Sequence, residues 1–304
     1  MSQRPSHDRI AACLLAGALG DAIGSAFEGR ESIAGFDWPD TLHISDDTQL
    51  TLATCESIID RGAVDPESIA KQFAAWHRDR RITGVGASTL KALVELEAGG
   101  HWALVGASGE RAAGNGAAMR IAPLAFLLDP EVAADRQIIR DVSRITHRND
   151  EAYVGALAIL RSIRYLWSGS CAREGLLPSL LKSLPDSRVR ERLIEVQQDS
   201  LTIEQYAYRF NSSGYVVDSV PLAILAATNS NDLLSTLRQL IQCGGDTDTI
   251  ASMFSQLFGA ACGMQALPMG FIARIQGVSF IRETIDRFVQ SAGLHQDRRK
   301  SSIQ

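Results

Sequence analysis

The sequence predicts an all-α protein that folds as a single domain. Apolar residues recur with the 3.6-residue period of an amphipathic helix along nearly the whole chain, and no segment shows the sustained alternation of a half-buried strand. Hydrophobic residues occupy 45% of the 304 positions and charged residues 21%, which is enough apolar material for a sizeable core. Because no shift in composition marks a boundary, we expect one domain over residues 1–304, with a core over 10–291 and a polar tail over 292–304.

The composition also argues against several classes of function. The net charge is -5 and the pI is near 5.7, whereas proteins that bind nucleic acid usually carry a basic excess, so nucleic acid is not an expected partner. Five cysteines without a C-x-x-C pair predict free thiols in a reducing compartment. No run fits a signal peptide or a membrane span, so we expect a cytoplasmic monomer without a membrane partner.

Small residues interrupt the first apolar helix, which we expect over residues 10–27. Gly20 and Gly24 lie inside it, although glycine in a helix interior costs about 1 kcal/mol relative to alanine. Two interpretations are open for them: close packing against another backbone, or a helix end that faces a ligand. Asp21 is interpreted as a hydrogen-bonding acid of the first helix pair, and Glu28 by default as a solvated acid at the helix end.

Glycine and serine open the next segments. A loop over residues 30–44 leads to a helix that starts at Ser45, and further helices are expected over 67–81 and 87–98. The sequence GVGAST at 84–89 opens the last of these helices. It is a weak pattern for a phosphate-binding loop, because the unpaired N–H groups of a helix start attract anions.

The second half of the chain continues the helical pattern. Pro123 is expected to kink or interrupt a helix that the sequence GNG opens, and Pro221 to lie in the first turns of another. The polar tail from His295 is expected to be frayed. The expected helices cover residues 117–128, 130–147, 150–167, 216–228 and 250–262, one lies between Asp232 and Gly244, two follow residue 262, and a peripheral helical hairpin covers 172–199.

Two of these helix starts carry dense sets of oxygen ligands, GGDTDT at residues 244–249 and SDDT at 45–48. On a regular helix, residues two apart point about 200° away from each other, so Asp246 and Asp248 can converge only where the chain is not yet helical. Hydroxyl and carboxylate oxygens without thiolate or imidazole suit Mg²⁺ or Mn²⁺. If the two starts meet, two divalent ions are the simplest answer to the repulsion among four carboxylates. The alternative is that each cluster only caps its own helix.

Six motifs in this order resemble those of the ADP-ribosylglycohydrolase family, and together they span residues 10–264. The resemblance implies an orthogonal multi-helix fold with a dinuclear Mg²⁺ or Mn²⁺ centre at the floor of a cleft. It also implies hydrolysis of the bond between C1″ of ADP-ribose and an acceptor. The motifs are GALGDAIGSAFEG (17–29), SDDT (45–48), GNGAAMRIAPLA (114–125), THRNDEA (146–152), GYVVDSVPLAI (214–224) and GGDTDTIA (244–251).

The resemblance also implies roles for particular residues. Asp246 or Asp47 would act as the base that activates water, and Glu28 as a lid ligand or a proton donor. Nothing in the family pattern matches residues 172–199. The implied metal ligands are Ser45, Asp46, Asp47, Asp246, Asp248 and Thr249. The implied substrate contacts are Gly114, Asn115 and Gly116 as a backbone cradle for the pyrophosphate, His147 on the ADP-ribose and Tyr215 stacked on the adenine.

Three hypotheses of function follow. The leading one is a metal-dependent hydrolase that releases ADP-ribose from a modified protein or a small conjugate. The second is a non-catalytic ADP-ribose-binding or crystallin-like member of the family. The two intact acidic motifs argue against it, because a purely structural descendant need not keep all six metal ligands. The third is another all-α metal phosphohydrolase; the six histidines, none beside the acids, argue against the histidine-aspartate type. The motifs do not choose among arginine, serine, a nucleic-acid end, acetylated ADP-ribose or guanidine as the source of the acceptor.

Overall fold

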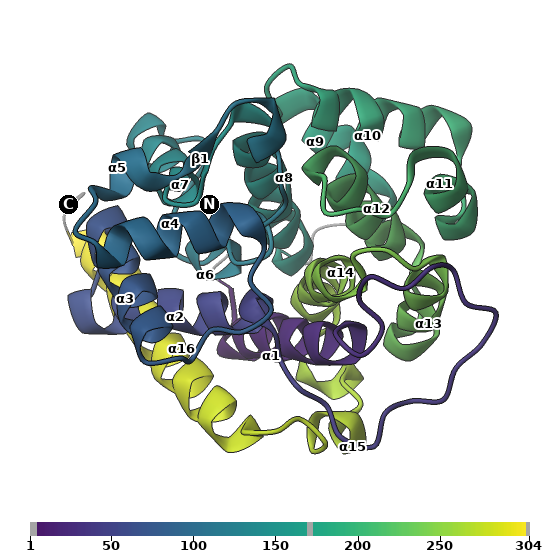
Figure 1. Ribbon diagram of the computed structural model, residues 1–304, viewed down its shortest axis with the longest axis horizontal. Helices are drawn as coiled ribbons and strands as arrows, with labels where there is room; N and C mark the ends of the chain where they lie inside the picture. The colour runs from purple at the N-terminus through teal and green to yellow at the C-terminus, as the bar shows by residue number, and fades with distance from the viewer. Residues whose placement is uncertain (1–4, 169–172, 302–304) are drawn as a thin grey trace.

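Two antiparallel helices lie side by side at the centre of the molecule (Figure 1). The computed structural model describes residues 5–168 and 173–301, with side chains up to residue 293. The central pair is α1 (His7–Gly24) and α14 (Thr247–Cys262), which form the most extensive contact between any two elements. Apart from two strands of two residues each, the regular secondary structure of the described residues is helical, so the all-α prediction is confirmed.

The other helices surround this pair. They are α2 (Asp46–Arg61), α3 (Pro66–Arg78), α4 (Ala87–Glu97), α5 (Trp102–Val105), α6 (Ala122–Ala125), α7 (Ala133–Arg144), α8 (Asp150–Trp167), α9 (Leu176–Ser183), α10 (Arg188–Asp199), α11 (Ile203–Phe210), α12 (Val216–Asn229), α13 (Leu233–Cys243), α15 (Met269–Ile272) and α16 (Val278–Ser301). Three 3₁₀ turns are η1 (Glu110–Ala112), η2 (Arg173–Gly175) and η3 (Met264–Ala266). Two short parallel strands, β1 (Ala107–Ser108) and β2 (His147–Arg148), pair Ala107 with His147.

Glycines set the distance between α1 and α14. A Cβ on Gly20 would lie 2.2 Å from the Ala251 carbonyl oxygen, and one on Gly24 would lie 2.4 Å from the Thr247 carbonyl oxygen. Both distances are far below van der Waals contact, so only glycine permits this approach. The close-packing interpretation is therefore confirmed. It also brings the C-terminal end of α1 against the start of α14.

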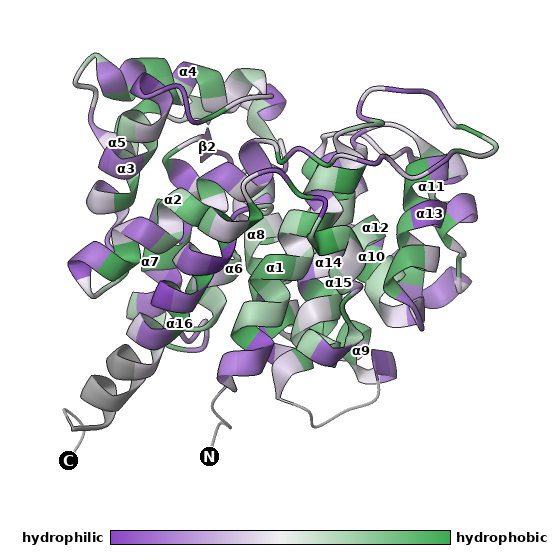
Figure 2. Ribbon diagram, turned by 90° about the horizontal axis from the view of Figure 1, so that it is seen from below, coloured by the Kyte–Doolittle hydropathy of each residue, from purple (hydrophilic) through white to green (hydrophobic). Residues whose placement is uncertain are grey.

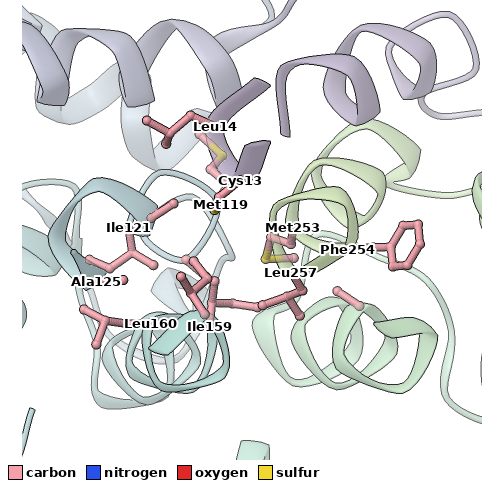
Figure 3. Packing of buried hydrophobic residues seen from close by; sticks show 14 of the residues in the cluster. Cys13, Leu14, Met119, Ile121, Ala125, Ile159, Leu160, Met253, Phe254 and Leu257 are labelled. Carbon is pink, nitrogen blue, oxygen red and sulfur yellow. The ribbon is translucent and has the colours of Figure 1, made fainter. Parts of the chain in front are cut away.

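The core lies around these central helices. In Figure 2 the hydrophobic residues concentrate on α1 and α14, whereas the outer helices carry more hydrophilic residues. Figure 3 shows how buried side chains of α1, α8 and α14 meet those of residues 119–125, the segment that contains α6. The labelled residues are Cys13, Leu14, Met119, Ile121, Ala125, Ile159, Leu160, Met253, Phe254 and Leu257. Cys13, Cys55, Cys243 and Cys262 are free thiols, of which the first two are buried, and Cys171 lies outside the described residues.

Several boundaries differ from the sequence prediction for local reasons. The first helix begins at His7, because the Ser6 side chain accepts a hydrogen bond from the Arg9 N–H, and it ends at Gly24 rather than at 27, where a turn follows. The helix predicted over 117–128 is interrupted, as expected from Pro123: only Ala122–Ala125 form a helix, α6, and Pro123 lies in its first turn.

The later boundaries also deviate. Helix α7 ends at Arg144, so His147 lies in β2 rather than in the predicted helix. The fraying predicted from His295 is wrong up to Ser301, because the backbone of α16 is helical to that residue. The predicted hairpin over 172–199 is present as α9 and α10 at the periphery (Figure 1). Within the described ranges, no helix combines the length and the apolar character needed to cross a membrane.

Candidate metal centre and substrate cleft

The two acidic helix starts meet in space. The Thr249 hydroxyl, at the start of α14, donates a hydrogen bond of 3.1 Å to Oδ2 of Asp47, at the start of α2. The close packing of α1 against α14 supplies the remaining acids, because it places Asp21 near both starts. Six carboxylates therefore occupy one region of the molecule: Asp21, Glu28, Asp46, Asp47, Asp246 and Asp248.

The acids form two groups that share one residue. In the first group, one carboxylate oxygen from each of Asp21, Asp47 and Asp248 lies within 4.8 Å of the others. In the second group, the same holds for Glu28, Asp246 and Asp248. Asp248 thus lies between two clusters of oxygen atoms, each with the size expected of a cation site.

At the start of α2, Asp21 organises the backbone. Its carboxylate accepts hydrogen bonds from the Ser45 N–H and hydroxyl, the latter at 2.6 Å, and from the Thr48 N–H at 3.1 Å. The Ser25 hydroxyl donates a further bond of 3.0 Å. The prediction that Asp21 is a hydrogen-bonding acid of the first helix pair is confirmed. Because both its oxygens already accept from these donors, Asp21 holds the helix start in place.

At the start of α14, glycines bend the chain. Gly244 and Gly245 have φ values of 73° and 80°, and a Cβ on Gly245 would lie 2.2 Å from the Ser212 carbonyl oxygen. Asp246 is the N-cap residue but forms no capping hydrogen bond with its side chain. Its Oδ2 instead accepts a 2.6 Å bond from the Asn115 side chain. The prediction that the chain is not yet helical at Asp246 is confirmed.

None of the buried acids of this cluster forms an ion pair with a lysine or arginine among the described residues, although the charge of the buried Arg120 interacts with that of Asp46. Burial, and then the charges of neighbouring acids, raise the pKa of Asp46 and Asp47 well above the ordinary value for aspartate. Burial and the adjacent Asp246 raise the pKa of Asp248 to about 10. Asp47 Oδ1 is buried and has no hydrogen-bond partner among the described residues. A divalent cation would supply the missing charge and a partner for that oxygen, so these residues fit such an ion.

A cleft of about 450 Å³ opens above the acids. No lysine or arginine of the described chain lines it. The predicted site residues that line it are Glu28, Asp46, Gly114, Asn115, Gly116, His147, Asp246, Asp248 and Thr249. Ser45, Asp47 and Tyr215 are not part of its lining.

The loop that carries Glu28 is attached to the start of α14. The Gly29 N–H donates to the Gly245 carbonyl oxygen at 2.9 Å, and the Gly245 N–H donates to the Arg30 carbonyl oxygen at 2.9 Å. This pairing turns Glu28 toward Asp246 and Asp248. Partial burial, and then the charges of Asp246 and Asp21, raise the pKa of Glu28. Glu28 is exposed, as the default interpretation of a solvated acid expects, and it also faces the cluster.

Packing explains the glycines of the GNG motif. A Cβ on Gly114 would lie 2.9 Å from Nε2 of His147, and one on Gly116 would lie 2.8 Å from Cε1 of the same ring. The Asn115 N–H donates to the Gly214 carbonyl oxygen at 3.1 Å. That N–H is occupied in this structure, and the role of Gly114, Asn115 and Gly116 as a cradle for the pyrophosphate stays a prediction. The Asn115 side chain orients Asp246.

His147 lies in the wall of the cleft as a neutral ring. Its Nδ1 is 2.8 Å from the Thr146 hydroxyl. Burial, and then the positive charge of Arg120, lower the pKa of His147 to about 3. His147 can therefore exchange hydrogen bonds with a ligand at neutral pH without carrying charge.

Tyr215 lies beside the cleft. Its backbone pairs with that of Gly114, and its neighbours Ser213 and Gly214 line the cavity. Its hydroxyl is 3.4 Å from Nη1 of Arg188 at the start of α10. Stacking of Tyr215 on an adenine stays a prediction, and it would require the adenine to extend past the rim of the cavity.

Sequence reasoning missed one feature of the site and indicated another only weakly. Arg120 is 1% exposed, and its guanidinium donates to the carbonyl oxygens of Gly116 and Val142. An arginine inside the apolar run after GNG was a signal for this buried role. The start of α4, residues 86–89, forms one wall of the cleft. The glycine loop before α4 indicated that it could meet a ligand.

Comparison with known proteins is consistent with this arrangement. A family model described as ADP-ribosylglycohydrolase matches residues 2–301 of the chain. The chain belongs to the ADP-ribosylglycohydrolase family. This family is hydrolytic, so the prediction of an enzyme of this class is confirmed.

The similarity to other ADP-ribosylglycohydrolases covers nearly the whole chain. The ADP-ribosyl-[dinitrogen reductase] glycohydrolase of Rhodospirillum rubrum is 26% identical, over 95% of this chain and 98% of its own. The ADP-ribosylarginine hydrolase Tri1 of Pseudomonas putida is 27% identical, over 88% and 74%. Human ADP-ribosylhydrolase ARH3 is 25% identical, over 97% and 95%. A solved structure described as an ADP-ribosylglycohydrolase-related protein complex has the same fold, with a TM-score of 0.76 at 22% identity over 94% of this chain and 98% of its own.

Proposed function

We propose that this chain is a divalent-metal-dependent hydrolase that cleaves the C1″ bond between ADP-ribose and an acceptor on a protein or a small conjugate, releasing ADP-ribose. The observation that carries the proposal is the convergence of two acidic helix starts, joined by the hydrogen bond from Thr249 to Asp47. The two helix starts lie far apart in the sequence, and helix capping alone does not explain why their four aspartates are buried together. The cleft above them supplies the space for a ligand.

The acidic residues would hold two Mg²⁺ or Mn²⁺ ions. Two groups of carboxylates with Asp248 in common support two ions rather than one. Hard oxygen donors without a sulfur or nitrogen ligand favour these metals. The proposed ligands are those that the sequence pointed to: Ser45, Asp46, Asp47, Asp246, Asp248 and Thr249. When bound, the ions would supply positive charge that orients the ribose hydroxyls and makes a nearby water more acidic.

Asp246 is the better candidate for the base. It lines the cleft, and Asn115 fixes its carboxylate, whereas Asp47 is 1% exposed and lies beneath the lining. In the proposed reaction, the water oxygen bonds to C1″ while its proton passes to Asp246. The bond from C1″ to the acceptor breaks with its electron pair on the acceptor. The raised pKa of Glu28 suits it to protonate that leaving acceptor.

The carboxylates around C1″ would also stabilise the transition state. Departure of the acceptor leaves positive charge on the ribose ring, as in other glycosidases. Asp246 and Asp248 lie at the cavity surface, where that charge would develop. His147, as a neutral hydrogen-bonding group, and the Gly116 backbone would hold the rest of the ADP-ribose.

The cellular setting forms part of the same proposal. Free thiols are typical of reducing compartments, so we place the protein in the cytoplasm. We further propose that residues 1–304 act as one domain and as a monomer.

The test is a panel of defined ADP-ribosyl conjugates, in which release of ADP-ribose is measured with Mg²⁺, with Mn²⁺ and with chelator. Arginine, serine, nucleic-acid-end, acetyl and guanidine conjugates belong in the panel, because all of them share the ADP-ribose half. The arginine conjugate has the further support that one relative is named an ADP-ribosylarginine hydrolase. We expect release from at least one conjugate, dependent on metal and abolished in Asp246→Ala. Tight binding of ADP-ribose without turnover of any conjugate would contradict the proposal.

A further inference from the structure

The turn over residues 212–215 holds the start of α14 in place. The Asp246 N–H donates to the Ser212 carbonyl oxygen at 2.8 Å, and the Ser212 hydroxyl donates to the Gly244 carbonyl oxygen at 2.8 Å. A Cβ on Gly214 would lie 3.2 Å from Oδ2 of Asp246, which is tighter than an ordinary van der Waals contact. The position of Asp246 therefore depends on the position of this turn.

The same turn holds the residue that orients the Asp246 carboxylate. The Gly214 carbonyl oxygen accepts a hydrogen bond of 3.1 Å from the Asn115 N–H, and the Asn115 side chain donates to Asp246 at 2.6 Å. Ser213 and Gly214 line the cleft together with Asp246. A displacement of the turn would therefore move both the backbone partner and the side-chain partner of Asp246.

Asp218, in the first turn of α12, holds the turn through Ser213. The Ser213 hydroxyl donates to Oδ2 of Asp218 at 2.8 Å and accepts a hydrogen bond of 3.2 Å from the Tyr215 N–H. The N-cap residue of α12, Tyr215, supplies no side-chain cap of its own. Asp218 is buried, and a buried carboxylate is costly unless a cation or further donors compensate it. Its second partner therefore decides how firmly it holds Ser213.

That second partner is Arg192, on α10. Its Nη1 lies 3.4 Å from Oδ1 of Asp218, and its Nε lies 2.9 Å from Oε2 of Glu195. The guanidinium carbon also lies 3.8 Å from the centroid of the Phe210 ring. A planar guanidinium that contacts two acids and an aromatic ring is fixed in one orientation. Arg192 can therefore fix the carboxylate of Asp218 in turn.

Helix α10 is itself fixed, so Arg192 starts from a defined position. The helix lies beside α12 (Figure 1). At its start, Glu151 on α8 accepts hydrogen bonds from the Arg188 N–H at 2.9 Å and from the Val189 N–H at 3.1 Å. Leu193, the neighbour of Arg192, is fully buried. An unbroken series of contacts thus runs from α10 to the turn beside Asp246.

We propose that Arg192 is a positioning residue for the acidic centre: through Asp218 and Ser213 it fixes the turn over residues 212–215, and so holds Asp246 in place. Arg192 does not line the cleft, so it acts through the turn and takes no part in the chemistry. The inference rests on the proposed function for the task of Asp246. It gives a role to a helix that none of the six motifs covers.

Two variants break the series at different points. Arg192→Met removes the charge and keeps the length of the side chain, whereas Ser213→Ala removes the hydroxyl and leaves the ion pair intact. Arg192→Lys keeps the charge without the planar guanidinium. Arg209→Met is the matched control. Arg209 also lies over the Phe210 ring, at 4.7 Å, and pairs with Asp199, and no hydrogen bond among the described residues joins it to the turn.

The first measurement is the affinity of the metal-free full chain for Mn²⁺, by titration calorimetry, and the second is kcat and KM on the best conjugate. We expect Arg192→Met and Ser213→Ala to bind Mn²⁺ about 10-fold more weakly, because loss of a group that holds a metal ligand in place costs 10- to 100-fold in affinity or activity. In Arg192→Met, kcat should fall by a similar factor while KM changes little. Arg192→Lys should recover part of both losses, and Arg209→Met should behave as the wild type.

Thermal unfolding shows whether each variant is folded, and several outcomes would overturn the inference. Unchanged Mn²⁺ affinity in folded Arg192→Met would do so; if that variant does not fold, unchanged affinity in Ser213→Ala would. An equal loss in Arg209→Met would assign the effect to the stack on Phe210 rather than to the turn. A wild-type protein that binds no Mn²⁺ would overturn the inference together with the metal centre, whereas Mn²⁺ binding without turnover of any conjugate would contradict only the proposed function.

Discussion

The starts of α2 and α14 have similar sequences but different structures. At α2, Ser45 caps the helix, and Asp21 reaches across from α1 to accept hydrogen bonds from the Ser45 and Thr48 N–H groups. At α14, Asp246 occupies the cap position without capping, and two glycines with positive φ set the direction of the chain. One start is fixed by hydrogen bonds from another helix, and the other by backbone shape.

The difference shows which acids are free for chemistry. Capping was the alternative interpretation of both acidic clusters, and at α2 that task falls to Ser45 and Asp21 rather than to Asp47. At α14, the Asp246 side chain is held by Asn115 and not by its own helix. Asp47 and Asp246 therefore keep oxygens that point into the shared cluster, which capping alone does not explain.

The largest expected effect comes from the residue that belongs to both groups of acids. Asp248→Ala should lower turnover by more than about 100-fold, because even residues one step outside a metal's ligands cost 10- to 100-fold when removed. The measurement is kcat on the best conjugate of the panel. Thr249→Val, which removes only a neutral donor at the same helix start, should cost less. Equal activity of Asp248→Ala and wild type would remove Asp248 from the centre.

The position of the start of α14 depends on the close approach of α1 to α14. Gly20→Ala should lower the free energy of unfolding by about 3 kcal/mol, because the added methyl would overlap the Ala251 carbonyl. Gly35→Ala is the control: nothing lies within 4 Å of the added methyl, and it should change stability little. Urea unfolding monitored by circular dichroism measures both. Equal stability of the two variants would mean that glycine is not required at the helix crossing.

Asp21, which holds the start of α2 by hydrogen bonds, and Asp46, which belongs to the acidic cluster, should have opposite effects on stability when each is replaced by asparagine. In metal-free protein, Asp21→Asn should destabilise by about 1–3 kcal/mol, because the new NH₂ group faces donors that Asp21 now accepts from. Asp46→Asn should instead raise stability by about 1 kcal/mol, because it relieves repulsion among buried carboxylates. Urea titrations in chelator compare them. The distinction between structural and functional acids fails if both variants change stability in the same direction.

A smaller effect concerns the cleft wall. His147 has a pKa lowered to about 3 in the folded protein, whereas the unfolded chain binds that proton near 6.5. Protonation of His147 therefore favours the unfolded state as the pH falls from 6.5 toward 3. The free energy of unfolding should decrease over this range by up to about 1.4 kcal/mol per pH unit. His147→Asn should lack this component. Unfolding free energies of both proteins at pH 7, 6 and 5 test it, and parallel pH curves would show that His147 is not buried in its neutral form.

The acids of the site could be predicted from the sequence, but the features that depend on packing between distant segments could not. Asp46, Asp47, Asp246 and Asp248 were identifiable from residue type and motif, and the bend before Asp246 followed from helix geometry. The packing role of the GNG glycines could not be predicted from the sequence, because it depends on where the His147 ring lies. The periodicity also predicted the helices well but not the short strand at His147, whose partner Ala107 is 40 residues away.

The most direct test of the account is a titration of metal-free protein with Mn²⁺, followed by calorimetry or electron paramagnetic resonance. Two Mn²⁺ ions should bind to each wild-type chain and fewer than two to Asp248→Ala, since both groups of acids contain this residue. No binding to the wild type, or two ions bound equally well by both proteins, would contradict the claim that the two helix starts form one metal centre.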